Sequence, residues 1–327
     1  MEKFDVIIVG AGAAGLAAGW KLSKSGLKVA CFELGKSISK ESIIPIEDGG
    51  EIQRYGDLSY DPNIRPRENN YKINSTNSPI QIANFNGVGG STFLFSAQYP
   101  RFQSSDFSTF SLDKVGYDWP INFETLEKYY SLNDKITGLA GLKGDPFYPN
   151  VVPNMPPVPL GPMGRKIAYG FNNLKWKWWP AYAALNTLPY NGRPADTYKR
   201  PSNLGDFSKS KGSTDNTYLP LSIRNGMILK TNSEVLKLNL CKDSNLIESI
   251  NYKNSEGGYS RAIAKVFLLS ASGIGTPRIL LSSSLESKKN GLANKSDMVG
   301  RNLMLHPLGY IEGVFDENIH SNVGPQG

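Results

Sequence analysis

The sequence predicts an α/β fold in which a buried parallel sheet is combined with a small antiparallel meander. Three observations point to this fold class. Near the N-terminus an apolar run, a glycine-rich turn, a helical pattern and a second apolar run follow one another, which is the order of a βαβ unit. Farther along, short segments separated by turn residues are typical of antiparallel strands. The 327 residues are 39% hydrophobic and 20% charged, a globular composition that excludes a disordered chain and a disulfide scaffold.

The βαβ unit occupies the first 33 residues. Phe4–Val9 is an apolar run, interrupted only by Asp5 and rich in β-branched residues, which predicts a strand buried on both faces. After the glycine-rich turn, a helical pattern runs to Ser25, and Gly26 lies where a helix C-terminal glycine is expected. Leu27–Phe32 predicts a second strand, which Glu33 ends.

The middle of the chain gives weaker signals. It is polar and irregular from Gly35 to about Ser78. A helix is predicted over Phe123–Lys135, with Asn122 as its N-cap and acidic residues in its first turn. A run of prolines from residue 146 to residue 162 predicts an extended connection along the surface.

The last third predicts mostly strands. A further buried strand is expected over Lys265–Ala271, followed by a short helix with Thr276 as N-cap and Pro277 at its first position. The four strands of the meander are expected at Met227–Thr231, Glu234–Leu240, Ile247–Lys253 and Tyr259–Ala264.

The glycine-rich turn has the chemistry of a dinucleotide-binding site. A dinucleotide diphosphate carries two negative charges, and the first turn of a helix offers it unpaired N–H groups and the positive end of the helix dipole. In this interpretation Gly10 permits the tight turn, Gly12 the close approach of the diphosphate and Gly15 the packing of helix on strand. Ala13 and Ala14 complete the loop. The alternative is a glycine-rich turn that binds nothing.

Glu33 lies 18 residues after the last of these glycines, at the distance where a carboxylate accepts the ribose hydroxyls of a dinucleotide. A glutamate here disfavours the 2′-phosphate of NADP, but the βαβ unit alone does not separate a nicotinamide cofactor from FAD. A second glycine cluster, Gly87–Thr92, either turns its backbone amides toward an anion or flat ring, or is a hairpin turn.

Composition excludes several classes of site and partner. Cys31 and Cys241 lie far apart without a metal-ligand spacing, so we expect no metal site. The 36 Lys and Arg against 29 Asp and Glu give a mild net charge of +7 without a basic stripe, so we expect no nucleic-acid partner. No apolar run approaches the ~20 residues of a transmembrane helix, and no signal-peptide pattern opens the chain. We therefore expect a cytoplasmic protein.

Seven segments, spread over nearly the whole chain, are together typical of one protein family. In this order they resemble the glucose-methanol-choline (GMC) flavoprotein oxidoreductases, and within that family the gluconate 2-dehydrogenase-like branch. The segments are VGAGAAG at residues 9–15 with Glu33, Asn86–Ser96, Tyr99–Phe102, Asp118–Pro120, Lys211–Pro220, Gly273–Leu281 and Val299–Pro307.

The resemblance implies a non-covalently bound FAD on a three-layer Rossmann-like domain with an inserted substrate or cap domain. It places the first part of the FAD-binding domain at residues 1–100, the inserted region at 101–224 and the second part at 225–327, with the C-terminal part of the family fold missing. The implied cofactor-binding residues are Gly10, Gly12, Ala13, Ala14 and Gly15 at the diphosphate, Glu33 at the ribose, Gly89, Gly90, Ser91 and Thr92 along the diphosphate and isoalloxazine, Val235 at the adenine, and Ser272 and Gly273 over the adenosine half.

The resemblance also implies an activity: oxidation of a CH–OH group of an alcohol, sugar or polyol by hydride transfer to flavin N5. The expected partners are a small-molecule alcohol or sugar substrate and an electron-acceptor subunit. Besides a cytoplasmic location, the resemblance is also compatible with export or with membrane association through such a subunit.

Departures from the family pattern qualify these expectations. Where some relatives carry a histidine that tethers the flavin covalently, this chain has Leu94. Where related sequences are rich in cysteine before the KGSTD segment, it has Ser202, Asp206 and Ser208.

The family's catalytic histidine and its partner belong to a C-terminal segment that this chain does not show; it ends after a strand expected over Leu308–Phe315. Neither His306 nor His320 matches the catalytic position, so we expect no catalytic residue. His306 either approaches the flavin or is a structural histidine.

Two other interpretations stay open. The chain is either a nucleotide-binding fragment without turnover or an NAD(P)H-using flavoprotein of another family. The latter would need a second GxGxxG motif, which the sequence does not show. Trp176, Trp178 and Trp179 either line a substrate cleft or fill a core or domain interface. Arg54 and Arg101 either assist anion binding or are solvated or ion-paired.

Overall fold

The structure is a computed structural model that describes residues 2–39, 50–65, 71–148, 150–206, 208–242, 244–283, 289–306, 309 and 311–319. Its internal contacts divide the chain into two compact units. Unit 1 consists of residues 1–94 and 214–314, and unit 2 of residues 95–213 and 315–327. The chain therefore leaves unit 1 after the second glycine cluster and returns to it before the predicted meander.

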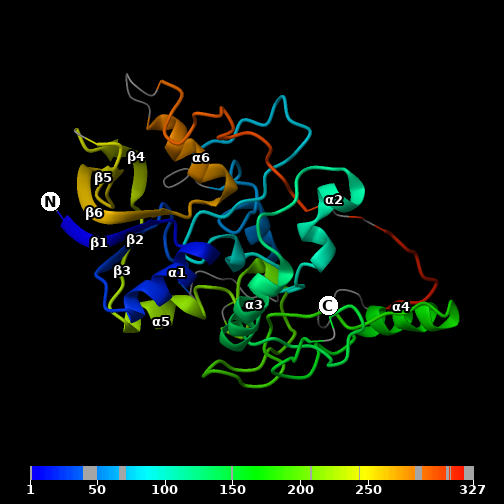
Figure 1. Cartoon of the computed structure of the whole chain (residues 1–327). Coiled ribbons are helices and arrows are strands. Elements are labelled where there is room, and N and C mark those ends of the chain that lie inside the picture. The colour runs from blue at the N-terminus through cyan, green and yellow to red at the C-terminus, as the bar shows by residue number, and fades with distance from the viewer. Residues whose placement is uncertain are drawn as a thin grey trace. The chain divides into compact units, whose positions relative to one another are not determined.

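Unit 1 is built on one six-stranded sheet with the order β3-β2-β1-β6-β5-β4 (Figure 1). Strands β3, β2, β1 and β6 pair in parallel, whereas β6, β5 and β4 pair antiparallel. Val9 lies opposite both Phe32 and Leu269, so three parallel strands end side by side. The strands are β1 Glu2–Val9, β2 Val29–Phe32, β3 Ile228–Lys230, β4 Glu234–Leu240, β5 Ile247–Lys253 and β6 Tyr259–Leu269.

Strand β1 is buried from Val6 to Val9, as the apolar residues of this segment predict. Helix α1 (Ala13–Lys24) packs against β1 and β2 and beside α5 (Tyr218–Arg224). Ile8 faces α1, because a Cβ added at Gly15 would lie 3.3 Å from its side chain. The neighbouring Ile7 points the other way, into a cluster shared with β4 and β5. This arrangement confirms the predicted α/β class with a parallel sheet and a meander.

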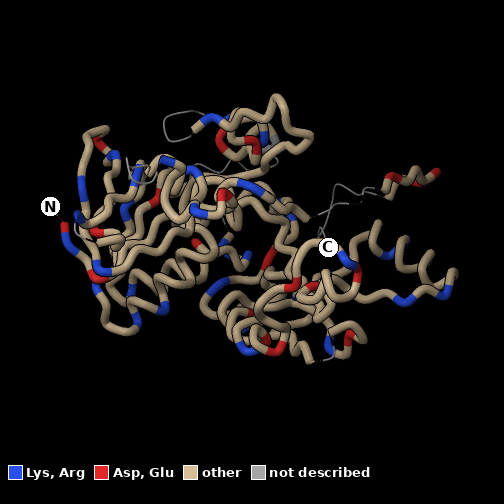
Figure 2. Tube along the Cα trace, turned by 45° about the horizontal axis from the view of Figure 1, so that its top comes forward, with Lys and Arg blue, Asp and Glu red and all other residues tan. Residues whose placement is uncertain are grey.

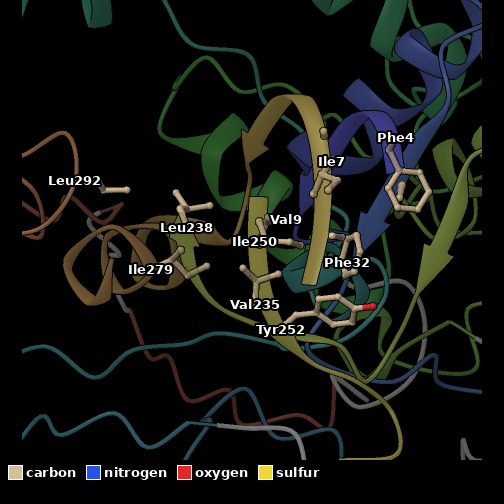
Figure 3. Packing of buried hydrophobic residues seen from close by; sticks show 13 residues of the cluster. Phe4, Ile7, Val9, Phe32, Val235, Leu238, Ile250, Tyr252, Ile279 and Leu292 are labelled. Atoms are coloured by element: carbon tan, nitrogen blue, oxygen red, sulfur yellow. The ribbon is translucent and has the colours of Figure 1, made fainter. Parts of the chain in front are cut away.

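The core of unit 1 lies between the parallel strands and the meander (Figure 3). The rings of Phe32 and Tyr252 meet edge to face with centroids 4.8 Å apart, so β5 folds over β2. Helix α6 (Ser272–Ser282) contributes Ile279. Fully burying each large apolar side chain stabilises the fold by roughly 1.5–3 kcal/mol. The cluster consists of Phe4, Ile7, Val9, Ala30, Phe32, Val235, Leu238, Ile250, Tyr252, Ala262, Ala264, Ile279 and Leu292.

The prediction of the meander needs three corrections. The strands predicted at Tyr259–Ala264 and Lys265–Ala271 are one strand, β6, which pairs with β5 in its first half and with β1 from Ala262 onward. The second half of β6 is not buried, since Val266 is 56% exposed. The predicted strand Met227–Thr231 does not belong to the meander, because β3 pairs in parallel with β2.

Helix α6 also begins earlier than predicted. It starts at Ser272 rather than after Thr276, so Pro277 lies inside the helix. The side-chain oxygen of Ser272 accepts hydrogen bonds from the backbone N–H groups of Ile274 (3.2 Å) and Gly275 (3.4 Å). Ser272 thus satisfies first-turn donors, which is the role that the sequence analysis gave to Thr276.

Unit 2 has few regular elements. Its helices are α2 (Thr109–Asp113), α3 (Phe123–Thr137) and α4 (Pro162–Asn173). The predicted helix is confirmed as α3, and the side chain of Asn122 accepts a hydrogen bond from the backbone N–H of Thr125 at 3.0 Å. The sequence pattern does not predict helix α4, because its first residue, Pro162, is also the last proline of the run that predicts an extended connection. The 3₁₀ helices of the two units are η3 Gly50–Tyr55, η5 Gly90–Phe93, η6 Ser104–Phe107 and η7 Ser202–Leu204.

The C-terminal strand is not observed: the described residues of 308–315 have no regular structure, and 308 and 310 lie outside the described part. His320 and residues 323–327 lie outside it as well. Lys and Arg are interspersed with Asp and Glu in both units (Figure 2). None of the helices described is long and apolar enough to span a bilayer.

Candidate functional site

A cavity of about 450 Å³ opens in unit 1 where three parallel strands end. Val9, Phe32 and Leu269, the last residues of β1, β2 and β6, all line it. Ligands of open parallel sheets bind outside the carboxyl ends of the strands, and the volume lies within the range of roughly 300–1,000 Å³ of small-molecule sites. This cavity is therefore the candidate site.

The loop from β1 to α1 brings backbone rather than side chains to the cavity. Gly10 has a φ of +104°, and a Cβ there would lie 2.4 Å from the carbonyl oxygen of Ser270. A Cβ at Gly15 would lie 1.9 Å from the carbonyl oxygen of Gly10, so helix and strand approach too closely for any side chain. At Gly12 a Cβ would meet the Cα of Gly90 at 3.8 Å, which leaves space beside the loop.

Helix α1 presents an uncapped N-terminus to this space. Its N-cap residue, Gly12, is extended and makes no side-chain cap hydrogen bond, and the first turn contains no acidic residue. Ala13 and Ala14 line the cavity. Unpaired N–H groups and the positive end of the helix dipole make this position suited to an anion such as a diphosphate.

Glu33 lies in the cavity wall and not in solvent, with 6% of its surface exposed. One carboxylate oxygen accepts a hydrogen bond from the backbone N–H of Ala11 at 2.8 Å, and the other accepts one from Gly35 at 2.9 Å. Burial raises the pKa of the Glu33 carboxyl to about 7, although backbone hydrogen bonds from Gly35, Ala11 and Gly87 act in the opposite direction. Beside these backbone donors the carboxylate keeps acceptor capacity for a ligand hydroxyl group.

The second glycine cluster forms a tight loop at the cavity and not a hairpin. Gly89 and Gly90 both have positive φ, +94° and +54°, and η5 starts at Gly90. The backbone N–H of Gly89 donates to the carbonyl of Ala11 at 2.8 Å, which joins this loop to the first one. Gly90, Ser91 and Thr92 line the cavity.

Another wall of the cavity comes from the meander and α6. Val235 at the start of β4 is buried at 3% exposure and lines the cavity beside Ser233. Ser272, at the start of α6, lines it with a left-handed backbone of φ +70°. A serine held in this sparsely populated region is typical of a site where the surrounding structure fixes the backbone.

The structure brings most of the thirteen predicted cofactor-binding residues together at this cavity. Gly15 and Gly89 lie behind the two loops and support them, and Gly273 is exposed in the first turn of α6. The residues that line the cavity are Gly10, Gly12, Ala13, Ala14, Glu33, Gly90, Ser91, Thr92, Val235 and Ser272.

Two of the residues that line the cavity, Tyr71 and Arg278, are not among the predicted cofactor-binding residues. The guanidinium of Arg278 lies 4.4 Å above the ring of Tyr71, and both residues line the cavity. Arg278 also pairs with Glu234 at 3.3 Å. Such stacking of an arginine on an aromatic ring contributes roughly 0.5–2 kcal/mol. Tyr71 lies in a segment without regular structure, so periodicity could not place it.

Other residues considered from the sequence lie elsewhere. Arg101 is buried and forms an ion pair of 2.6 Å with Asp134, which confirms the ion-paired alternative for this arginine. His306 is exposed and is not among the described residues that line the cavity. In the segment before Lys211, Ser208 donates a hydrogen bond of 2.6 Å to Asp206.

The tryptophans of unit 2 are not core residues. Trp176 is 61% exposed and stacks on Phe171 with ring centroids 5.7 Å apart. Trp178 is half-buried and donates a hydrogen bond of 2.9 Å to the side chain of Asn172. Among the residues that the structure describes, no three His, Cys, Asp or Glu side chains form a group that could hold a metal ion.

Two family models match the chain. Residues 5–43 match the FAD binding domain, and residues 197–308 match the GMC oxidoreductase model. The first match covers the first glycine loop and Glu33, and the second covers β3 to α6. FAD is therefore the dinucleotide for which the cavity of unit 1 is built.

Curated relatives resemble the chain over nearly its whole length. The 2-methyl-1,2-propanediol dehydrogenase of Mycolicibacterium austroafricanum is 34% identical over 318 residues, which are 96% of this chain and 57% of the relative. The fructose dehydrogenase large subunit of Gluconobacter japonicus is 27% identical over 337 residues, 93% of this chain and 58% of the relative. The chain thus spans little more than half the length of these relatives.

A solved structure shows the same fold. Pyridoxine 4-oxidase from Mesorbium loti superposes with a TM-score of 0.55 at 18% identity, over 86% of this chain and 52% of that protein. The family models, the relatives and the geometry of the two glycine loops agree, and the chain belongs to the GMC oxidoreductase family, of which it represents the N-terminal portion.

Proposed function

We propose that this chain is the FAD-binding portion of an oxidoreductase that oxidises a CH–OH group of an alcohol, sugar or polyol. The observation that carries the proposal is that one cavity is lined by an uncapped helix N-terminus, a second glycine loop and the buried carboxylate of Glu33. These are the groups that a dinucleotide needs for its diphosphate and its ribose.

Each group has a distinct task in this proposal. The N–H groups at Gly12 and Ala13 bind the diphosphate, and Glu33 accepts the ribose hydroxyls. Gly90, Ser91 and Thr92 lie along the diphosphate and the isoalloxazine, while Val235 and Ser272 enclose the adenosine half. When bound, FAD supplies the acceptor for a hydride from the alcohol carbon.

The residues fit such a cofactor because the two loops bring backbone without side chains to the cavity wall and pack closely on each other. A Cβ on Gly90 would lie 2.8 Å from the Cα of Gly12, and one on Gly10 would strike Ser270. We propose that the flavin is held without a covalent bond, since Leu94, a buried leucine, replaces the tethering histidine of some relatives.

We further propose that unit 2 belongs to the substrate or cap region expected over residues 101–224, and that residues 1–100 and 225–327 form the FAD-binding domain. The fructose dehydrogenase relative is named a large subunit, which supports a partner subunit that accepts electrons. The cytoplasmic location and the gluconate 2-dehydrogenase-like branch remain predictions, which fractionation of cells and the reaction with a panel of sugar acids would test.

A second candidate is a cofactor-binding fragment without turnover. It is favoured by the absence of a histidine from the described residues that line the cavity, since a general base within about 3 Å of the substrate hydroxyl, or one water away, is needed for the reaction.

The experiment is a visible absorption spectrum of the purified chain, followed by anaerobic addition of alcohols, polyols and NADH. A flavin spectrum bleached by a polyol supports the oxidoreductase, whereas a flavin spectrum that no alcohol bleaches supports the fragment. Absence of a flavin spectrum after incubation with FAD would contradict both candidates. Bleaching by NADH alone would indicate a flavoprotein of another family.

Denaturation tests how the flavin is held. Acid or detergent should release all flavin into the filtrate, because Leu94 offers no atom for a covalent bond. Flavin fluorescence that stays with the denatured polypeptide on a gel would contradict the non-covalent proposal.

A further inference from the structure

The second glycine loop has a conformation that needs support from elsewhere in the chain. Gly89 and Gly90 are both left-handed, and the loop continues into only four residues of 3₁₀ helix, Gly90–Phe93. Short 3₁₀ turns have few hydrogen bonds of poor geometry, so they do not fix such a loop by themselves. Contacts from other segments must therefore decide where it lies.

Thr214 supplies these contacts from 122 residues farther along the chain. The carbonyl oxygen of Gly89 accepts hydrogen bonds from the hydroxyl of Thr92 at 2.6 Å and from the hydroxyl of Thr214 at 3.2 Å. The two hydroxyl oxygens lie 2.9 Å apart, and the backbone N–H of Thr214 donates to the hydroxyl of Thr92 at 3.1 Å. The three residues therefore form a closed network, which we call the threonine clamp.

The threonine clamp is buried behind the loop. Thr214 is 5% exposed and is not among the described residues that line the cavity, whereas Thr92 is. Asp215 fills the space beside the loop, since a Cβ added at Gly89 would lie 2.9 Å from its carboxylate oxygen. Because Thr214 does not line the cavity, a change there reaches a ligand through the loop.

We propose that Thr214 is a positioning residue of the cofactor site. With Thr92 it holds Gly89 in place, and thereby sets the close contact between Gly90 and Gly12 and the position of the cavity wall along which the FAD diphosphate and the adjoining flavin would lie. The inference rests on the proposed function. It also gives a role to the segment Lys211–Pro220, which the sequence analysis singled out only by resemblance.

The test compares Thr214→Val, Thr214→Ser and Ser222→Ala in the full chain. Valine keeps the shape of threonine without the hydroxyl, and serine restores the hydroxyl. Ser222 is a matched control in unit 1: it is fully buried and its hydroxyl donates to backbone carbonyls of Tyr218 (2.8 Å) and Leu16 (3.3 Å), away from the loop. The measurements are FAD affinity of the apo chain by flavin fluorescence, visible circular dichroism of bound flavin, and the unfolding midpoint of each apo variant.

We expect Thr214→Val to raise the Kd for FAD about five- to tenfold, because one or two neutral hydrogen bonds are lost. The visible circular dichroism of the bound flavin should change as well. Thr214→Ser should restore both, and Ser222→Ala should lower the unfolding midpoint without changing the Kd. A Thr214→Val chain with wild-type affinity and dichroism overturns the inference, and so does a serine variant as weak as the valine variant. A wild-type chain that binds no FAD refutes the proposed function instead.

Discussion

The two glycine loops that meet at the cavity differ in what holds them. The first loop is fixed mainly within the βαβ unit to which it belongs: the N–H of Gly10 donates to the carbonyl of Phe32 at 2.8 Å, and Gly15 packs directly on Gly10. The second loop is fixed by distant segments, through Ala11, Lys36 and Thr214. One loop is therefore part of the core of unit 1, and the other is placed on it.

Because the two loops are held differently, substitutions in them should differ in their effects on the stability of the fold and on FAD binding. A change in the first loop disturbs the contact between β1 and α1, on which the sheet depends, whereas a change in the second loop leaves the sheet intact and moves one wall of the cavity. We expect substitutions where the first loop packs on the sheet, as at Gly15, to lower the free energy of unfolding most, and substitutions of the residues that hold the second loop, as at Thr214, to act mainly on FAD affinity.

The largest effect is expected from Gly15→Ala. The added Cβ would lie 1.9 Å from the carbonyl oxygen of Gly10, which neither backbone can avoid, so we expect a loss of about 3 kcal/mol in the free energy of unfolding. Urea unfolding measures it. The control is Gly170→Ala in α4, where a Cβ would meet nothing within 4 Å and should leave stability unchanged or slightly raised. If Gly15→Ala unfolded like the wild type, the first loop would not have the observed packing.

Glu33→Gln should have the next largest effect, on FAD affinity. The amide has one acceptor oxygen and cannot serve both the backbone N–H groups and the ribose as the carboxylate does, and charge-assisted hydrogen bonds are worth roughly 1.5–3 kcal/mol. We expect the Kd for FAD to rise about tenfold or more, measured by fluorescence titration at pH 8. Unchanged affinity would remove Glu33 from the cofactor site.

The pH dependence of the same variant sharpens this result. Because the pKa of Glu33 is raised to about 7 by burial, the folded apo chain holds a proton between pH 4.5 and 7 that the unfolded chain has lost. Relative to Glu33→Gln, the wild-type apo chain should therefore lose stability as pH rises through this window, by on the order of 3 kcal/mol. The pKa values of Cys31 and Tyr71 are also raised by burial, so both stay neutral there.

FAD binding should show the opposite trend. Ribose hydroxyls donate to the ionised carboxylate, so the affinity of the wild type should rise as pH increases toward about 7 and level off above it. In Glu33→Gln the affinity should be flat over the same range. A wild-type affinity that does not change between pH 5.5 and 8 would show that Glu33 stays in one protonation state when FAD binds.

The same difference explains what could be predicted from the sequence. The strand, turn, helix and second strand of the first 33 residues were predicted because their signals are local: apolar runs, glycines at fixed spacing and an acid at the strand end. The meander was less well predicted, because nothing local shows that β6 (Tyr259–Leu269) continues through Lys265 and pairs with two different neighbours.

The cavity could be predicted only in part for the same reason. Gly87–Thr92 could be singled out by composition, but whether it was a hairpin or a ligand loop depended on contacts with Ala11 and Thr214, which lie far away in sequence. Tyr71 and Arg278 come together from different ends of unit 1, so no spacing rule brings them to the site. Helix α4 could not be predicted, because Pro162 is equally compatible with an extended connection and with the first position of a helix.

Gly90→Ala and Gly12→Ala form a reciprocal pair at the contact of the loops. A Cβ on Gly90 would lie 2.8 Å from the Cα of Gly12 in a backbone with φ +54°, whereas a Cβ on Gly12 would meet Gly90 at an ordinary 3.8 Å. We expect Gly90→Ala to cost about 2 kcal/mol of apo stability, and Gly12→Ala to change it by less than about 0.5 kcal/mol.

Both variants should weaken FAD binding about tenfold or more, because each adds a methyl group at the contact of the two loops that form the cavity wall proposed for the diphosphate. Thermal unfolding of the apo chains and fluorescence titration separate the two effects. Equal loss of stability in both variants would show that the loops do not meet in the observed register.

The smallest effect concerns the coupling of Thr92 and Thr214. If the threonine clamp acts as a unit, Thr92→Val and Thr214→Val should not be additive in the free energy of urea unfolding: once one hydroxyl is gone, removing the other costs less. We expect a coupling of about 1 kcal/mol, the size of a neutral buried hydrogen bond. Thr92→Val combined with Ser222→Ala, which shares no hydrogen bond with it, should be additive within roughly 0.5 kcal/mol. Additivity in both cycles would mean that Ala11 and Lys36 hold the second glycine loop without Thr214. Because Ala11 belongs to the first loop, Lys36 would then be the only one of these three residues that fixes the second loop from a distant segment.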